Sequence, residues 1–126
     1  MPVDVFKIGS VEMLVLLFLR ERDAHGYQLV QMLEEYSGGA LTVKTASLYP
    51  ILYKLADNGY ITGKETFVER KMPNRTGLSA RVRIVYHLEP AGHQRLEELI
   101  AEHETFVKAC YTVISRTERN GDGDEK

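Results

Sequence analysis

The chain has very little cysteine and no tryptophan: Cys110 is the single thiol among 126 residues. One cysteine excludes an intramolecular disulfide and any zinc site built on a pair of cysteines. The longest apolar run is Met13–Leu19, far shorter than the roughly 20 residues that span a bilayer. No signal-peptide pattern is visible at the N-terminus either. We therefore expect a cytoplasmic protein that does not associate with membranes.

Sequence motifs for catalysis and cofactor binding are also missing. The chain contains no Gly-x-Ser-x-Gly, no phosphate-binding loop and no cluster of metal ligands. Its four histidines, at positions 25, 87, 93 and 103, do not have the spacing of a metal site. We predict that the chain is not an enzyme, with no catalytic residues, no bound metal and no cofactor.

Charge is distributed unevenly along a chain whose formal net charge is only -2. Residues 64–88 contain six basic and two acidic residues, whereas residues 89–126 contain nine acidic and five basic ones. Because local potential steers binding to phosphates, the total charge does not exclude a nucleic-acid partner. The hydrophobic fraction of 44% is ordinary for one globular domain of this length.

The segment from Thr45 to Ile61 predicts a helix followed by an extended strand. Leu48, Leu52 and Leu55 recur at spacings of three and four, which places them on one helical face. Hydroxyl residues at its start are suited to capping, and Asn58-Gly59 is suited to ending the helix. We interpret this helix as the one that enters the DNA major groove.

The surrounding pattern predicts a winged helix-turn-helix. Helices are expected from Ser10 and over 27–36, with Tyr27, Val30, Leu33 and Tyr36 facing inward. After the 45–58 helix, 61–68 is rich in β-branched residues and 81–88 alternates between apolar and other residues, which predicts the two strands of a hairpin. Between them, 70–77 has the Pro, Asn and Gly of a turn. Two helices, a recognition helix and a basic hairpin follow the order of that fold.

The last helix, expected over 90–115, has an apolar stripe resembling a coiled-coil seam. A domain this small cannot cover such a stripe, so we predict that the helix forms a dimer. The first helix is apolar nearly all round, which fits a core helix, a partner-facing helix or both. The predicted interface is Val11, Val15, Phe18, Leu96, Leu99, Ile100, His103, Phe106, Val107, Cys110, Val113 and Ile114. Cys110 suits an apolar filler, and His103 suits an exposed seam residue or a polar register contact.

The predicted fold class is α+β, mostly α, in four segments. These are a lead-in (1–9), a winged helix-turn-helix domain (10–88), a dimerisation helix (89–115) and a disordered polar tail (116–126).

Several of these segments together resemble the PadR family of bacterial transcriptional regulators. They are His25-Gly26-Tyr27-Gln28-Leu29, Ser47-Leu48-Tyr49-Pro50-Ile51-Leu52, Leu55 through Gly59-Tyr60-Ile61, and Tyr86-His87-Leu88-Glu89-Pro90-Ala91-Gly92. The likeness covers roughly residues 10–115 and fits members with a single short C-terminal helix. One departure is Ala46-Ser47, where the family has Gly-Thr. Serine keeps the hydroxyl group, whereas alanine removes backbone freedom.

The resemblance implies a homodimeric DNA-binding regulator, most often a repressor of a pseudo-palindromic operator. It also implies release from double-stranded DNA by a small aromatic or lipophilic effector. The expected DNA contacts combine this resemblance with the positions of basic and hydroxyl groups. They are Tyr27, Lys44, Thr45, Ser47, Tyr49, Lys54, Arg70, Lys71, Arg75, Arg81 and Arg83.

Each of these residues also has a purely structural interpretation. Tyr27 fits a core position, the hydroxyl residues fit helix caps, and the lysines and arginines fit a solvated surface. A second function also stays open, that of a winged-helix protein-interaction module without DNA binding, because a fold does not determine a function. The basic hairpin favours DNA.

Overall fold

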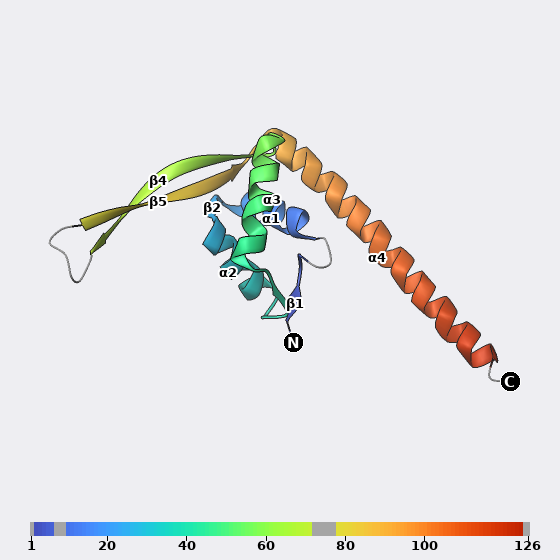
Figure 1. Ribbon diagram of the computed structural model, residues 1–126. Helices are drawn as coiled ribbons and strands as arrows, with labels where there is room; N and C mark the ends of the chain where they lie inside the picture. Colours follow the sequence, from blue (N-terminus) through green and yellow to red (C-terminus); the bar gives the residue numbers. More distant parts are fainter. Residues whose placement is uncertain (1, 7–9, 72–77, 125–126) are drawn as a thin grey trace.

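The computed structural model describes residues 2–6, 10–71 and 78–124, with side chains except in 67–71, 78–82 and 119–124. Its helices are α1 (Val11–Glu21), α2 (Gly26–Tyr36), α3 (Thr45–Asp57) and α4 (Pro90–Asp124), and its strands are β1 (Val3–Asp4), β2 (Ala24–His25), β3 (Leu41–Thr42), β4 (Ile61–Lys71) and β5 (Leu78–Leu88). Three helices followed by a hairpin are the order of the predicted winged helix-turn-helix. Figure 1 shows the hairpin and α4 extending from opposite sides of the α1–α3 cluster.

The core lies where the apolar faces of α1, α2 and α3 meet the inner ends of the hairpin and α4. Leu48, Leu52 and Leu55 of α3 are at most 1% exposed, as their three- and four-residue spacing predicts. Tyr86 and Leu88 of β5 and Leu96 of α4 join the same cluster. Burial of this kind contributes about 1.5–3 kcal/mol for each large aliphatic side chain.

The inward face predicted for α2 is partly wrong. Leu33 is buried, together with Leu29 and Met32. Tyr27 and Tyr36, by contrast, are 57% and 55% exposed. The aliphatic side chains fill the interior, and both phenol rings lie at its edge with their polar ends in water.

The ends of α3 agree with the sequence in part. Asn58 follows the last turn, and Gly59 has a φ of +78°, the left-handed conformation that favours glycine. At the other end, Lys44 occupies the N-cap position and no side chain caps the helix there. Thr45 and Ser47 are therefore not caps but residues inside the first turn.

The sheet has the order β2–β5–β4, and both pairings are antiparallel. The hairpin register runs from Ile61 opposite Leu88 to Lys71 opposite Leu78, so both strands are longer than predicted. The two residues of β2 pair with β5, Ala24 opposite Tyr86 and His25 opposite Val85. This short pairing attaches the start of α2 to the side of the hairpin.

From Val3 to Val5, the predicted lead-in is part of the fold. The strand β1 pairs in parallel with β3, Val3 opposite Leu41 and Asp4 opposite Thr42. Val5 is only 1% exposed. A single apolar residue in a short segment carries no periodicity, which is why the sequence did not indicate this strand.

The predicted disordered tail is wrong up to Asp124, because α4 continues from the predicted end at residue 115. The Thr117 hydroxyl donates a hydrogen bond to the Ile114 carbonyl across this junction (2.9 Å). Extending a formed helix costs far less than starting one, so polar residues can follow the preceding turns. Within the described residues, no helix is both long and apolar enough to cross a membrane.

Gly92 is the most closely packed of the glycines that the structure describes. A Cβ at this position would overlap the Tyr60 carbonyl oxygen and Cδ1 of Leu88. The carbonyl cannot easily move, because it accepts a hydrogen bond from the Glu89 N–H (3.0 Å).

We therefore expect Gly92→Ala to lower the free energy of unfolding by about 1–3 kcal/mol, although alanine favours helices. Urea unfolding followed by circular dichroism measures this change. The exposed neighbour His93 is the control, and His93→Ala should stay within about 0.5 kcal/mol of the wild type. Equal stability of all three proteins would contradict the packing described here.

Candidate nucleic-acid interface

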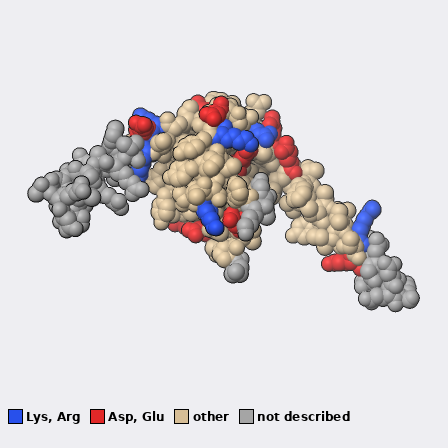
Figure 2. Space-filling model, in the orientation of Figure 1, with Lys and Arg blue, Asp and Glu red and all other residues tan. Residues whose placement is uncertain are grey.

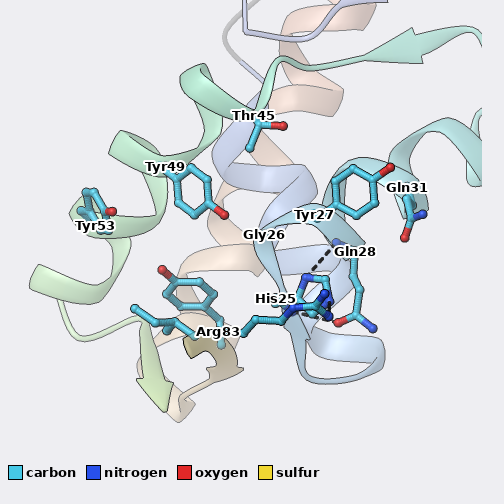
Figure 3. Close-up of a pocket in the computed structure, with 11 residues that line it drawn as sticks. His25, Gly26, Tyr27, Gln28, Gln31, Thr45, Tyr49, Tyr53 and Arg83 are labelled. Atoms are coloured by element: carbon cyan, nitrogen blue, oxygen red, sulfur yellow. Dashed lines mark hydrogen bonds between the residues drawn. The ribbon is translucent and has the colours of Figure 1, made fainter. Parts of the chain in front are cut away.

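One cavity of about 730 Å³ opens between the start of α2, the outer face of α3 and the base of β5. Figure 3 shows side chains of these three elements around it, with Arg83 reaching toward His25 and the Tyr49 hydroxyl pointing toward Gly26. Its lining residues are His25, Gly26, Tyr27, Gln28, Gln31, Thr45, Tyr49, Tyr53, Arg83, Ile84 and Tyr86. None of these is acidic, so the cavity presents hydroxyl, amide, imidazole and guanidinium groups.

The Tyr49 ring is fixed by its close approach to α2. A Cβ on Gly26 would lie 3.0 Å from Oη of Tyr49 and 3.1 Å from two ring carbons. A larger residue at this position would require the phenol to move away by a few tenths of an ångström. The glycine of the His-Gly-Tyr segment and the tyrosine of the Leu-Tyr-Pro segment thus meet in space.

Four of the seven tyrosines line this cavity. Tyr49 and Tyr53 are one turn apart on α3, with ring centroids 6.3 Å apart. Tyr86 is buried below them, and burial, together with the neighbouring phenols, raises its pKa. A phenol that stays protonated keeps its hydroxyl as a hydrogen-bond donor, as required for binding an anionic backbone.

His25 is the N-cap of α2 and forms a reciprocal capping box with Gln28. The Gln28 N–H donates to Nδ1 of His25 (3.3 Å), and the His25 N–H donates to Oε1 of Gln28 (2.9 Å). On the other side of the ring, Nε2 lies 3.3 Å from Nη1 of Arg83. Burial and the Arg83 charge both lower the pKa of His25.

Arg83 is held on β5 by its pairing with β4. Thr66 lies opposite it on β4, and the Thr66 hydroxyl donates to the Arg83 carbonyl (3.2 Å). Among the described residues, no carboxylate forms an ion pair with Arg83. Figure 2 shows basic side chains where the hairpin leaves the domain.

The structure brings four of the predicted DNA contacts together at this cavity, namely Tyr27, Thr45, Tyr49 and Arg83. Lys44 is exposed immediately before α3, and Ser47 is half-buried on another face of the helix. Arg75 lies outside the described residues. Arg70, Lys71 and Arg81 belong to the hairpin strands, but their side chains lie outside the described ones.

Lys54 is directed toward α1 and forms an ion pair with Glu12, with Nζ 3.3 Å from Oε1. The lysine side chain is 66% exposed, so the pair contributes at most about 1 kcal/mol to stability. The predicted contact of Lys54 with DNA would have to compete with this carboxylate.

Five further polar or aromatic lining residues were not predicted from the sequence, namely His25, Gln28, Gln31, Tyr53 and Tyr86. Two signals were available: Tyr53 follows Tyr49 by four residues on one helix, and Gln31 follows Tyr27 by four on another. The position of His25 beside Arg83 depends on the pairing of β2 with β5, which no local pattern encodes.

A second surface lies between α1 and α4, where a groove of about 550 Å³ is lined by Ser10, Glu12, Met13, Leu99, Glu102, His103, Phe106 and Val107. Phe106 is 66% exposed, and Tyr111, Val113 and Ile114 farther along α4 are also exposed. Ile100, Val107 and Cys110 are partly buried.

The predicted interface needs one correction. Val11, Val15, Phe18 and Leu96 are at most 6% exposed within the single chain, so they belong to its core. Met13, which was not predicted, lines the groove instead.

The sequence matches a family of known proteins. Residues 15–98 match the model of the transcriptional regulator PadR-like family. The negative transcriptional regulator PadR of Bacillus subtilis (strain 168) is 28% identical over 90 residues, which are 71% of this chain but 44% of that protein. The chain therefore matches less than half of the length of this relative.

Solved structures of transcriptional regulators have a similar fold. A transcriptional regulator from Clostridium thermocellum has a TM-score of 0.67 at 23% identity, over 85% of this chain and 92% of its own. Bacillus subtilis PadR in complex with operator DNA has a TM-score of 0.58 at 27% identity, over 71% of this chain and 46% of its own. The predicted fold class is confirmed.

The environments of two histidines predict opposite shifts in pKa. The pKa of His25 is lowered by burial and by the charge of Arg83. The pKa of His87 is raised by its hydrogen bond to Asp23 (2.8 Å) and by the charge of that carboxylate. An NMR titration of the imidazole resonances should show His25 below the usual value of 6.5 and His87 above it. Arg83→Gln should raise the first pKa, and Asp23→Asn should lower the second.

The two shifts affect stability with opposite signs. His25 favours folding when it is neutral, so its contribution is lost as pH falls below 6.5 through its lowered pKa. His87 favours folding when it is protonated, so its contribution is complete below 6.5 and lost as pH rises through its raised pKa. Titration of both rings at 6.5 would contradict the two environments.

Proposed function

Because the chain belongs to the PadR-like family of transcriptional regulators, we propose that it is a homodimeric repressor of a pseudo-palindromic operator. A small aromatic or lipophilic effector would release it from double-stranded DNA. Membership of this family also agrees with the prediction that the chain is not an enzyme. The bound DNA, the dimer and the effector are each supported by a different part of the molecule.

The convergence of Tyr27, Thr45, Tyr49 and Arg83 on one concave surface carries the proposal for DNA. Three separate elements contribute these groups, and the surface contains hydrogen-bond donors without any carboxylate among its described lining residues. Hydroxyl and guanidinium donors beside a basic hairpin suit the phosphate backbone, which receives most protein–DNA hydrogen bonds. The complex of Bacillus subtilis PadR with operator DNA supports the same type of partner.

In the proposed complex, α3 lies in the major groove and the hairpin extends along the duplex. The exposed face of α3 presents Ala46, Pro50 and Tyr53. Contacts from the hairpin arginines would add affinity that depends on salt rather than on sequence. Two copies related by a two-fold axis would read half-sites about 34 Å apart, one turn of DNA.

The exposed apolar stripe on α4 supports the homodimer. Phe106, Val113 and Ile114 recur at helical spacings and leave a large apolar surface in water in the single chain. A monomeric soluble protein rarely exposes such a continuous patch. A second copy of α4, packed along the stripe beside the α1–α4 groove, would remove it from water.

The same groove supports an effector site. Its walls combine the apolar side chains of Met13, Leu99 and Phe106 with the polar ends of Glu12 and His103. Sites for small molecules are concave and mostly apolar with a few polar groups, which is the composition found here. An effector at this position would act on the packing of α1 against α4 and on the spacing of the two recognition helices.

Binding to the DNA upstream of the protein's own coding sequence tests the central proposal. We expect a gel shift that survives an excess of random DNA and occurs at low and moderate salt. The variant Arg81→Ala/Arg83→Ala should bind more weakly, and the magnitude of its salt slope should fall by about two, because two phosphate contacts are lost.

The matched control is Lys108→Ala/Arg116→Ala, which removes two positive charges from α4, away from the hairpin. Its salt slope should equal that of the wild type. An unchanged slope in the hairpin variant would contradict the role of Arg81 and Arg83. Absence of any shift, with a dimer confirmed by mass, would favour a protein-interaction module instead.

The dimer proposal is tested by Phe106→Glu. A carboxylate buried without a partner is unfavourable by a few kcal/mol, so the dimer dissociation constant should rise at least about tenfold. Analytical ultracentrifugation over a concentration series measures this change. Ala101→Glu adds the same charge to another face of α4 and should leave the dissociation constant unchanged. Equal effects of both substitutions would exclude the stripe as the interface.

A further inference from the structure

The capping box indicates which tautomer the neutral His25 ring adopts. Its Nδ1 accepts a hydrogen bond from the Gln28 N–H (3.3 Å), so Nδ1 carries no proton. A neutral imidazole has one N–H, which must then be on Nε2. The reciprocal bond from the His25 backbone N–H to Oε1 of Gln28 (2.9 Å) completes this capping box.

Nε2 of His25 faces a group that cannot accept its proton. Nη1 of Arg83 is 3.3 Å away, and a guanidinium has donors only. Two N–H donors this close do not satisfy each other, and both remain available to an acceptor placed beside them. The lowered pKa of His25 agrees with a ring that stays neutral next to the arginine.

The surroundings favour an anionic acceptor. Both donors lie in the wall of the 730 Å³ cavity, none of whose described lining residues is acidic. Figure 3 shows Arg83 reaching from β5 to the His25 ring, with the Tyr49 hydroxyl directed into the same space. A phosphate oxygen accepts from imidazole, guanidinium and phenol alike, and it would compensate the charge of Arg83.

We propose that the His25 Nε2–H and the Arg83 guanidinium together hold one phosphate group, supplied by the backbone of bound DNA. This assignment rests on the proposed DNA-binding function and adds a second role to His25, which would cap α2 and bind DNA with the two nitrogens of one ring. The DNA backbone is the preferred source over free phosphate, because Tyr27, Thr45 and Tyr49 extend the same donor surface beyond the two residues.

His25→Asn separates the two roles of this residue. Asparagine is among the best N-cap residues, so its side-chain oxygen can still accept from the Gln28 N–H. Its side chain is too short to replace Nε2 beside Arg83. Thermal unfolding should therefore be close to that of the wild type, whereas His25→Ala, which loses the cap as well, should be less stable.

The two donors differ in how they should affect DNA affinity. Using the upstream duplex, we expect His25→Asn to weaken binding by about 3–10-fold with an unchanged salt slope, because a neutral donor displaces no counterion. Arg83→Gln should weaken binding by about 10–100-fold and reduce the slope by about one. The double variant should lose less than the product of the two factors, since both residues share one phosphate.

A set of duplexes with one neutral methylphosphonate linkage at successive positions locates that phosphate. The wild type should lose affinity at one position in each half-site, and both single variants should lose less affinity than the wild type there, because each has only one of the two donors. Wild-type affinity of His25→Asn, or a reduced loss for the two variants at different positions, would overturn the shared site. Failure of the wild type to bind the duplex would instead reject the DNA-binding function on which the inference rests.

Inorganic phosphate alone distinguishes the two sources of the anion. We expect the His25 resonances to shift with DNA but not with millimolar phosphate at matched ionic strength. A shift with phosphate, together with no shift on DNA, would overturn the backbone as the source and assign a free-anion site.

Discussion

The antiparallel pairing of β2 with β5 is the constraint on which the candidate interface depends. Only two residues of β2 take part, Ala24 opposite Tyr86 and His25 opposite Val85. Because α2 begins at the next residue, this pairing fixes the start of α2 against the hairpin. It thereby places Gly26 under the ring of Tyr49 and His25 beside Arg83. Together with the shared core, the pairing holds the three elements that line the cavity in one frame.

Much of the fold could be predicted from local pattern. The spacing of Leu48, Leu52 and Leu55 indicated the buried face of α3, and Asn58-Gly59 indicated its end. The alternation along β5 indicated a strand with an apolar side, which Tyr86 and Leu88 confirm. These features depend on residues within one or two turns of each other, so their periodicity is present in the sequence itself.

The parts that were missed depend on contacts between distant residues. The strand β1 exists only because β3 lies beside it, and Val5 is buried by the same approach. Val11, Val15, Phe18 and Leu96 share the apolar character of the true surface stripe, so composition could not separate core from interface. For the site, the sequence indicated Tyr49 and Arg83 but not His25, whose second partner is 58 residues away.

Helices α1 and α3 connect the α1–α4 groove with the cavity between α2, α3 and β5. The α1–α4 groove includes Glu12, and Glu12 also forms the ion pair with Lys54 of α3. A change in the packing of α1 would therefore reach α3 through this ion pair. The proposed control by an effector requires such a link, in which one equilibrium is biased from two sites.

Hydrogen–deuterium exchange with and without the upstream duplex locates the DNA contact on the folded protein. We predict slower exchange on DNA binding for the backbone amides of residues 24–28, 45–53 and 83–86, with little change over residues 104–115 of α4. Protection confined to α4, or no protection at the cavity despite confirmed binding, would contradict the assignment of the cavity as the DNA-binding surface.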